Sequence, residues 1–194
     1  MRNPGRGYRN EFRIIGGEWR RRRLGFPAVP GIRPSPDRVR ETLFNWLQGR
    51  VEGAQCLDLF AGSGALGLEA LSRGAASCVF VDQERAVVEM LRAHLANLRV
   101  QTAELVQSDA IAYLDGAGGR FDLVFLDPPF ASDLLPRALN ALADHALLVP
   151  EARIYIECAV GQMPALPVGW RMLREARAGN VEFGLVTPDN LPLV

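Results

Sequence analysis

The chain has 194 residues, 48% of them hydrophobic, and a formal net charge of zero, which suits one α/β domain with a modest appendage. No apolar run approaches the roughly 20 residues that span a bilayer, and the arginine-rich start has no apolar signal segment, so the sequence predicts a cytoplasmic protein. Cys56, Cys78 and Cys158 form no C-x-x-C pair, so we expect buried free thiols and no metal site.

Positive charge is concentrated in the first 50 residues. This stretch holds twelve arginines and four acids, a net charge of +8 that the rest of the chain balances, and the protein contains no lysine. A basic segment on a neutral protein indicates a polyanionic partner. We therefore interpret residues 1–50 as a basic extension for RNA contact and residues 51–194 as the main domain.

Within the extension, residues 1–10 are rich in Gly, Arg and Asn and are predicted to be disordered. Two short strand-like runs, 12–15 and 18–24, flank Gly16-Gly17 and predict a β-hairpin. Ser35-Pro36-Asp37 is typical of a helix start, with Ser35 as the capping hydroxyl. The helix that follows has one apolar face, made of Val39, Leu43, Trp46 and Leu47.

From residue 51 onward, strand-like and helix-like runs alternate. This alternation predicts a mostly parallel sheet with helices on both faces, closed by an antiparallel pair. The expected strands are 54–60, 77–81, 103–107, 121–126, 153–160, 170–174 and 181–186, and the expected helices are 65–73, 84–98, a short helix through 114, and 134–146.

A glycine-rich turn follows the first of these strands. Gly62 and Gly64 come between the strand that ends at Phe60 and the helix that begins near Ala65, and Gly67 lies in the first turn of that helix. This is the context of a nucleotide-type cofactor loop. A dinucleotide loop holds a pyrophosphate and needs no acid. Here Asp58 precedes the first glycine by four residues, which suits a ligand with an amino group and no phosphate. We therefore predict S-adenosylmethionine.

Acids also end the next two strands. Asp82 stands 18 residues after Gly64, where a carboxylate can accept from ribose hydroxyls. Asp109 can accept from the adenine amine, although an aspartate in this place is also commonly a helix cap. The predicted cofactor-binding residues are Asp58, Phe60, Gly62, Ser63, Gly64, Asp82, Asp109 and Ala110.

The buried strand at 121–126 runs directly into Asp127-Pro128-Pro129-Phe130. An exocyclic base amine is a poor nucleophile, and the Asp127 carboxylate with the Pro128 carbonyl can hold its hydrogens. Consecutive prolines fix that carbonyl, and Phe130 can stack on the base. The first and fourth strands of a doubly wound sheet are neighbours, so this loop and the glycine loop should meet. The pattern predicts metal-free methyl transfer to a base amine, although the four residues alone also suit a rigid turn.

Several blocks together closely resemble one bacterial family, the 16S ribosomal RNA guanine-N2 methyltransferases called RsmD. They are Arg13-Ile14-Ile15-Gly16-Gly17, Arg33-Pro34, residues 37–47, residues 56–67 with Glu69-Ala70-Leu71-Ser72-Arg73, and the Asp127–Phe130 motif.

The resemblance implies a Rossmann-like class I fold, with a seven-stranded sheet and one antiparallel strand, and S-adenosylmethionine as cofactor. It implies N2 methylation of a guanine in 16S rRNA, with the small subunit or its assembly intermediate as partner, and we expect a monomer. It carries Asp58, Gly62, Gly64, Asp82 and Asp109 over as cofactor residues and Asp127 to Phe130 as catalytic ones. Two positions depart from the family: Arg21 replaces a usual glycine, and Pro36 replaces a usual polar residue.

We predict that arginines of the extension contact RNA phosphates. If the run from Arg20 to Arg23 lies on a strand, its side chains alternate faces and at most two of the four point the same way. Arg38, Arg40 and Glu41 either order the pocket or form surface pairs. The predicted RNA-binding residues are Arg13, Arg20, Arg21, Arg22, Arg23 and Arg38.

Two other functions stay open. A DNA adenine-N6 methyltransferase shares the Asp127–Phe130 motif, but the chain has no sizeable target-recognition insertion. An RNA-binding assembly factor without catalysis would not need Gly62, Gly64, Asp82 and Asp127 together.

Overall fold

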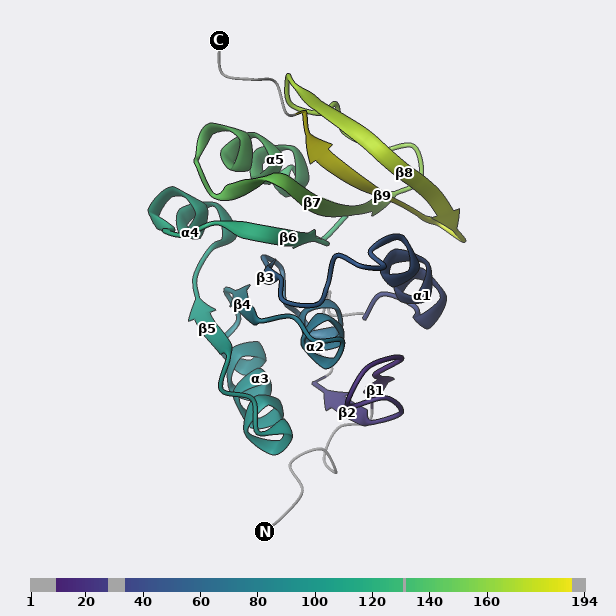
Figure 1. The fold of residues 1–194 in the computed structure, drawn as a ribbon, viewed down its shortest axis with the longest axis vertical. Coiled ribbons are helices and arrows are strands. Elements are labelled where there is room, and N and C mark those ends of the chain that lie inside the picture. Colours follow the sequence, from purple (N-terminus) through teal and green to yellow (C-terminus); the bar gives the residue numbers. More distant parts are fainter. Residues whose placement is uncertain (1–9, 28–33, 131, 190–194) are drawn as a thin grey trace.

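The computed structural model describes residues 10–27, 34–130 and 132–189. A central sheet separates two layers of helices, and a small hairpin lies outside one of these layers (Figure 1). No helix in the described ranges is long and apolar enough to span a membrane. The predicted disordered tail lies outside these ranges, apart from Asn10, which begins the first strand.

The main sheet has seven strands in the order β5-β4-β3-β6-β7-β9-β8. β3, β4, β5, β6 and β7 pair in parallel, whereas β9 is antiparallel to both β7 and β8. The predicted fold class, with one antiparallel strand, is thus confirmed. The strands are β3 (Gln55–Asp58), β4 (Ser77–Asp82), β5 (Ala103–Gln107), β6 (Phe121–Leu126), β7 (Leu148–Ala159), β8 (Trp170–Ala178) and β9 (Val181–Pro188).

Each face of the sheet is covered by its own hydrophobic cluster, because the buried strands carry apolar side chains on both faces. One cluster joins the hairpin to α1 (Asp37–Trp46), α2 (Ala65–Ser72) and α3 (Arg85–Leu98). The other contains the buried residues of α4 (Ala110–Gly116) and α5 (Leu134–Asp144). The N-terminal hairpin and α1 therefore share a core with the main domain (Figure 1).

The predicted hairpin is present, but its second strand is shorter than expected. β1 (Asn10–Arg13) pairs antiparallel with β2 (Arg23–Phe26). The segment from Trp19 to Arg22 forms turns instead of a strand, because Gly17 has a positive φ of 75° and Trp19 is buried. The expected alternation of Arg20 to Arg23 on a strand is therefore wrong: Arg20, Arg21 and Arg22 lie in a turn, and all four arginines are exposed.

Arg21 adopts the left-handed conformation, with φ of 71°. Its amide donates to the Ile14 carbonyl at 2.9 Å, which holds the turn closed. Residues other than glycine pay a steric cost in this region of φ. A glycine, which the family resemblance leads us to expect at this position, would avoid that cost.

A buried network of charged groups attaches the extension to α2. Arg40 is fully buried and donates to the backbone carbonyls of Ser35 and Arg13, at 3.2 and 2.8 Å. It also contacts Asp37 at 2.6 Å and Glu69 at 3.4 Å. Arg40 is therefore not part of a surface pair: it ties α1 to α2 through the first strand.

Candidate active site at the carboxyl edge of the sheet

The glycine loop sits at the end of β3, where two neighbouring strands hold it. The amides of Leu59 and Ala61 donate to the carbonyls of Phe125 and Val81, at 3.2 and 2.9 Å. Gly64, with φ of 77°, turns the chain into α2, and a Cβ there would collide with Leu91. The loop is thus placed by β4 and β6, on either side of β3.

Asp58 lies beneath this loop and is only 2% exposed. One carboxylate oxygen accepts from the Gly67 amide at 3.0 Å, so the side chain orders the first turn of α2. Burial, with the nearby Asp82 charge, raises the pKa of Asp58 to about 7, against the lowering effect of the Gly67 amide. Its influence on a ligand therefore passes through the loop backbone.

Asp82, at the end of β4, bridges the two neighbouring loops. Its oxygens accept from the Gly62 amide at 2.9 Å and the Glu84 amide at 2.8 Å. Burial raises its pKa. A carboxylate has about four acceptor positions, so further hydrogens can be bound while these two bonds persist.

Asp109 is the N-cap of α4. One carboxylate oxygen, Oδ1, accepts from the amides of Ile111 and Ala112, at 2.9 and 3.0 Å. Asp109 thus caps the helix through Oδ1. That its other oxygen, Oδ2, accepts from the adenine amine stays a prediction.

The Asp127–Phe130 motif, predicted to be catalytic, follows β6, the neighbour of β3. Asp127 is half-buried, Pro128 is buried, and Pro129 and Phe130 are exposed. Phe130 is 39% exposed, an unusual state for a large apolar ring in this protein. The structure brings this motif and the glycine loop to one edge of the sheet, as the strand order predicted, and leaves the Phe130 ring free to stack on a planar ligand.

Two polar residues beside Asp127 were missed in the sequence. Ser35 does not cap α1, whose N-cap residue is Pro36; its hydroxyl instead donates to Asp127 Oδ2 at 3.1 Å. Glu157, at the end of β7, is 3% exposed and accepts from the Tyr155 hydroxyl at 2.6 Å. An acid inside the otherwise uncharged run from Ile154 to Cys158 was the signal that could have pointed to Glu157.

The predicted RNA-contact arginines fall into two groups. Arg13 pairs with Asp37 at 3.0 Å, close to Ser35, and Arg38 is exposed on α1. The turn with Arg20 to Arg22 lies at the opposite edge of the sheet, since the Glu18 amide bonds to Ser72, the last residue of α2.

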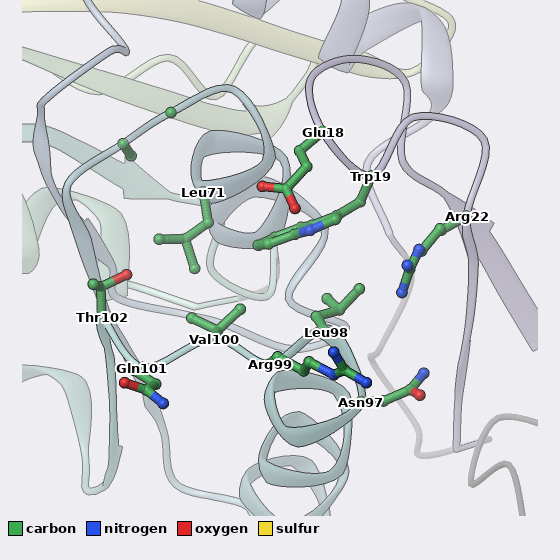
Figure 2. Close-up of a pocket in the computed structure, with 12 residues that line it drawn as sticks. Glu18, Trp19, Arg22, Leu71, Asn97, Leu98, Arg99, Val100, Gln101 and Thr102 are labelled. Atoms are coloured by element: carbon green, nitrogen blue, oxygen red, sulfur yellow. The ribbon is translucent and has the colours of Figure 1, made fainter.

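A polar hollow of about 940 Å³ borders that turn. Figure 2 shows Arg22 from the turn and Arg99 from the end of α3 beside it, with Trp19 between the turn and the helices. The hollow lies next to Thr102, just before β5 begins, and so at the amino edge of the sheet. It is separate from the glycine loop and the catalytic motif.

All three cysteines are buried and free. Within the described ranges, no group of three or more His, Cys, Asp or Glu side chains is arranged to hold a metal ion. The chemistry available at the carboxyl edge is that of acids, carbonyls and one exposed ring.

Comparisons with known proteins agree with this architecture. The family model described as Conserved hypothetical protein 95 matches residues 12–187. Ribosomal RNA small subunit methyltransferase D of Escherichia coli strain K12 is 47% identical over 186 residues, which are 95% of this chain and 94% of that protein.

Solved structures show the same fold. Putative methyltransferase yhhF from Escherichia coli has a TM-score of 0.84 and 48% identity, over 93% of this chain and 99% of that chain. The T. thermophilus 16S rRNA N2 G1207 methyltransferase RsmC, in complex with AdoMet and guanosine, has a TM-score of 0.65 and 24% identity, over 93% of this chain and 50% of that chain. The family model and the long, highly identical relative together show that this chain belongs to the RsmD family of methyltransferases.

Proposed function

We propose that this protein transfers a methyl group from S-adenosylmethionine to the exocyclic N2 amine of a guanine in 16S rRNA of the small ribosomal subunit. The observation that carries the proposal is the placement of the glycine loop and the Asp127–Phe130 motif on the paired strands β3 and β6. The 47% identity to ribosomal RNA small subunit methyltransferase D supports the RNA substrate. The guanine N2 position is the one that the resembling family modifies.

The carboxyl edge fits S-adenosylmethionine. A Cβ added at Gly62 would meet nothing nearer than the Phe60 carbonyl at 3.8 Å, so space is open above the loop. The Asp82 carboxylate borders this space through its bond to Gly62. In this arrangement Asp82 would accept from the ribose hydroxyls and Asp109 from the adenine amine. Asp58 would order the loop. When bound, the cofactor supplies an electrophilic methyl group on a sulfonium.

Residues of the chain then prepare the base. The Asp127 carboxylate and the Pro128 carbonyl accept the two hydrogens of the amine, which fixes the nitrogen and turns its lone pair toward the methyl group. Phe130 stacks on the base, which must leave its stack to enter the site. Proximity and orientation supply most of the acceleration, since effective concentrations of oriented groups can lower barriers by about 7–11 kcal/mol.

The substrate RNA is expected to contact two distant edges of the protein. The turn with Arg20 to Arg22 and the catalytic motif are separated by roughly the length of a six-residue strand, about 20 Å at 3.3 Å per residue. An RNA that contacts both must span this distance. The family resemblance implies that the substrate is an assembled or partly assembled small subunit. We propose a cytoplasmic monomer that contacts RNA through its basic extension.

The direct test is transfer of labelled methyl groups to three substrates: undermethylated small subunits, free 16S rRNA and DNA. Nucleoside analysis should find N2-methylguanosine, with the highest yield from the subunits. Methylated adenine in DNA would favour the adenine-N6 alternative, and cofactor binding without transfer to any substrate would favour the assembly factor. Asp82→Ala should weaken cofactor binding about 10-fold or more in calorimetry, because a charge-assisted hydrogen bond is removed.

A further inference from the structure

Two buried polar residues adjoin the catalytic motif, and the proposed function leaves both without a role. Ser35 is 5% exposed, and its hydroxyl donates to Asp127 Oδ2 at 3.1 Å. Glu157 is 3% exposed on β7, the strand that pairs with β6. Tyr155, on the same face of β7, donates its hydroxyl to Glu157 Oε2 at 2.6 Å. Burying such groups is costly unless they are hydrogen-bonded, and the bond that Ser35 makes here leads to Asp127.

The two carboxyl groups influence each other. Burial, followed by the charge of Glu157, raises the pKa of Asp127 well above its usual range, while the Ser35 hydrogen bond lowers it. Burial also raises the pKa of Glu157, against the lowering effect of the hydrogen bond from the Tyr155 hydroxyl. The charge of Glu157 therefore disfavours the ionised form of Asp127, so a proton is held more tightly on Asp127 than on an isolated carboxylate.

The reaction releases one proton that such a pair can accept. As the bond from N2 to the methyl carbon forms, the bond from that carbon to sulfur breaks, and its electron pair leaves on sulfur. The nitrogen becomes cationic and must lose one of its two hydrogens as a proton. Asp127 is the group that faces this amine in the proposed function.

Building on that function, we propose that Ser35 and Glu157 are positioning residues that act through Asp127. The Ser35 hydroxyl orients the Asp127 carboxylate, and Glu157, which is itself held by the Tyr155 hydroxyl, acts on Asp127 through its charge. The N–H bond of the amine breaks, an O–H bond forms on Asp127, and the proton stays there until solvent takes it. The extension thus takes part in chemistry, because Ser35 precedes α1.

Other titratable groups surround the pair in the described part of the chain. Asp58 on β3 adds a further negative charge that raises the pKa of Asp127. Cys158 follows Glu157 on β7, and its own pKa is raised to about 11, chiefly by burial. Arg40 contacts the Ser35 carbonyl at 3.2 Å, and its ion pairs are with acids other than Asp127 and Glu157. Among the described residues, the side-chain donors to this acid pair are therefore hydroxyl groups.

Two variants should shift the pH dependence of turnover in opposite directions. Glu157→Gln removes the like charge, lowers the pKa of Asp127 and moves the acidic limb of the rate profile to lower pH. Ser35→Ala removes the donor to ionised Asp127, raises that pKa and moves the limb to higher pH, with a reduction of about 10-fold in rate near neutrality. Ser35→Thr keeps the hydroxyl and should restore the wild-type profile.

The experiment uses single-turnover methylation of undermethylated small subunits across pH, with Glu151→Gln as the matched control. Glu151 is an exposed residue of the same strand and pairs with Arg50 at 2.8 Å, so its variant should leave the profile unchanged. Carbon-13 NMR of labelled aspartate carboxyls, assigned with Asp127→Asn, follows the titration of Asp127 in the protein alone. This second measurement needs no substrate.

Opposite shifts in both the rate profile and the NMR titration would support the proposal. Profiles and titrations that coincide with wild type in both variants would overturn it, and would leave the proposed function standing. If the wild-type protein methylates no guanine, the proposed function fails, while the NMR titration still decides whether Ser35 and Glu157 control Asp127. Glu157→Gln preserves side-chain size, which keeps that measurement possible.

Discussion

Two buried charged clusters begin within six residues of each other in the chain and differ in one respect. Around Arg40, opposite charges meet: Glu69 accepts from the amides of Ile15 and Gly16, each at 2.8 Å, and from Arg40 and Arg73. Around Ser35, two acids meet, Asp127 and Glu157, and a hydroxyl group donates to each of them.

This difference suggests a structural role for the cluster around Arg40 and a chemical role for the cluster around Ser35. A buried carboxylate with several donors is satisfied and holds its surroundings rigid. A buried pair of acids keeps raised pKa values, which is costly for folding and useful for proton transfer. The same short segment, residues 35–40, contributes to both clusters, so the extension carries the fold and the site together.

The largest expected effect comes from the acid pair. Asp127→Ala should reduce methyl transfer by about 10³-fold, because the acceptor of the amine hydrogens is removed. Binding of S-adenosylmethionine, measured by calorimetry, should change little, since Asp127 faces the base. Turnover like that of the wild-type protein would remove Asp127 from the catalytic site.

Substitutions in the cluster around Arg40 should change the stability of the protein and not its turnover. Arg40→Met should lower the free energy of unfolding by about 3 kcal/mol, because Glu69 stays buried with one ion-pair partner missing. Urea unfolding measures this decrease. Arg38→Met, on the exposed side of the same helix, is the matched control and should change stability by less than about 0.5 kcal/mol. Equal effects of the two variants would contradict the supporting role of Arg40.

The arginine turn should affect RNA affinity without changing the chemical step. Replacing Arg20, Arg22 and Arg23 by Gln should weaken binding to small subunits about 10-fold and reduce the salt dependence by roughly one unit of slope for each phosphate that the variant no longer neutralises. Single-turnover rates at saturation should persist. Arg137→Gln on α5, at the far face of the sheet, is the control. An unchanged salt slope would leave these arginines without a role in RNA contact.

The smallest effect concerns Arg21. Arg21→Gly relieves a positive φ and should raise the free energy of unfolding by about 1 kcal/mol, although glycine loses more conformational entropy on folding. Thermal unfolding compares it with Arg20→Gly, a neighbouring turn residue without a positive φ, which should destabilise or leave stability unchanged. A lower midpoint for Arg21→Gly would mean that the arginine side chain contributes more than the strain removes.

Much of the fold and the position of the glycine loop could be predicted because their signals are local. The bounds of β5 and β6 match the predicted runs, and α2 begins at Ala65 as expected after the glycine loop. The spacing of apolar residues, the glycines of the turn and the acids at strand ends can each be seen in a few consecutive residues. β7 was predicted to begin at Arg153 and begins at Leu148, since its first residues lack a clear strand pattern.

The site around Asp127 could not be completed this way. Ser35 has every local mark of a helix cap, and its hydroxyl bonds 92 positions along the chain instead. Arg40 is charged and was placed off the apolar face of α1, yet it is fully buried because Glu69 and two carbonyls lie opposite it. Both outcomes depend on the polar groups that other strands and helices place nearby, and the sequence of one segment does not contain that information.

Sequence alone was enough for the class of fold, the family, the cofactor loop and the Asp127–Phe130 motif, because each depends on short-range spacing along the chain. Tertiary structure decided which charges meet opposite charges and which meet like charges: Glu69 receives four donors, two of them arginines, while the charge of Glu157 acts on Asp127. The physical reason is that burial changes the energy of a charge according to the groups packed around it, and those groups come from strands and helices far apart in the chain.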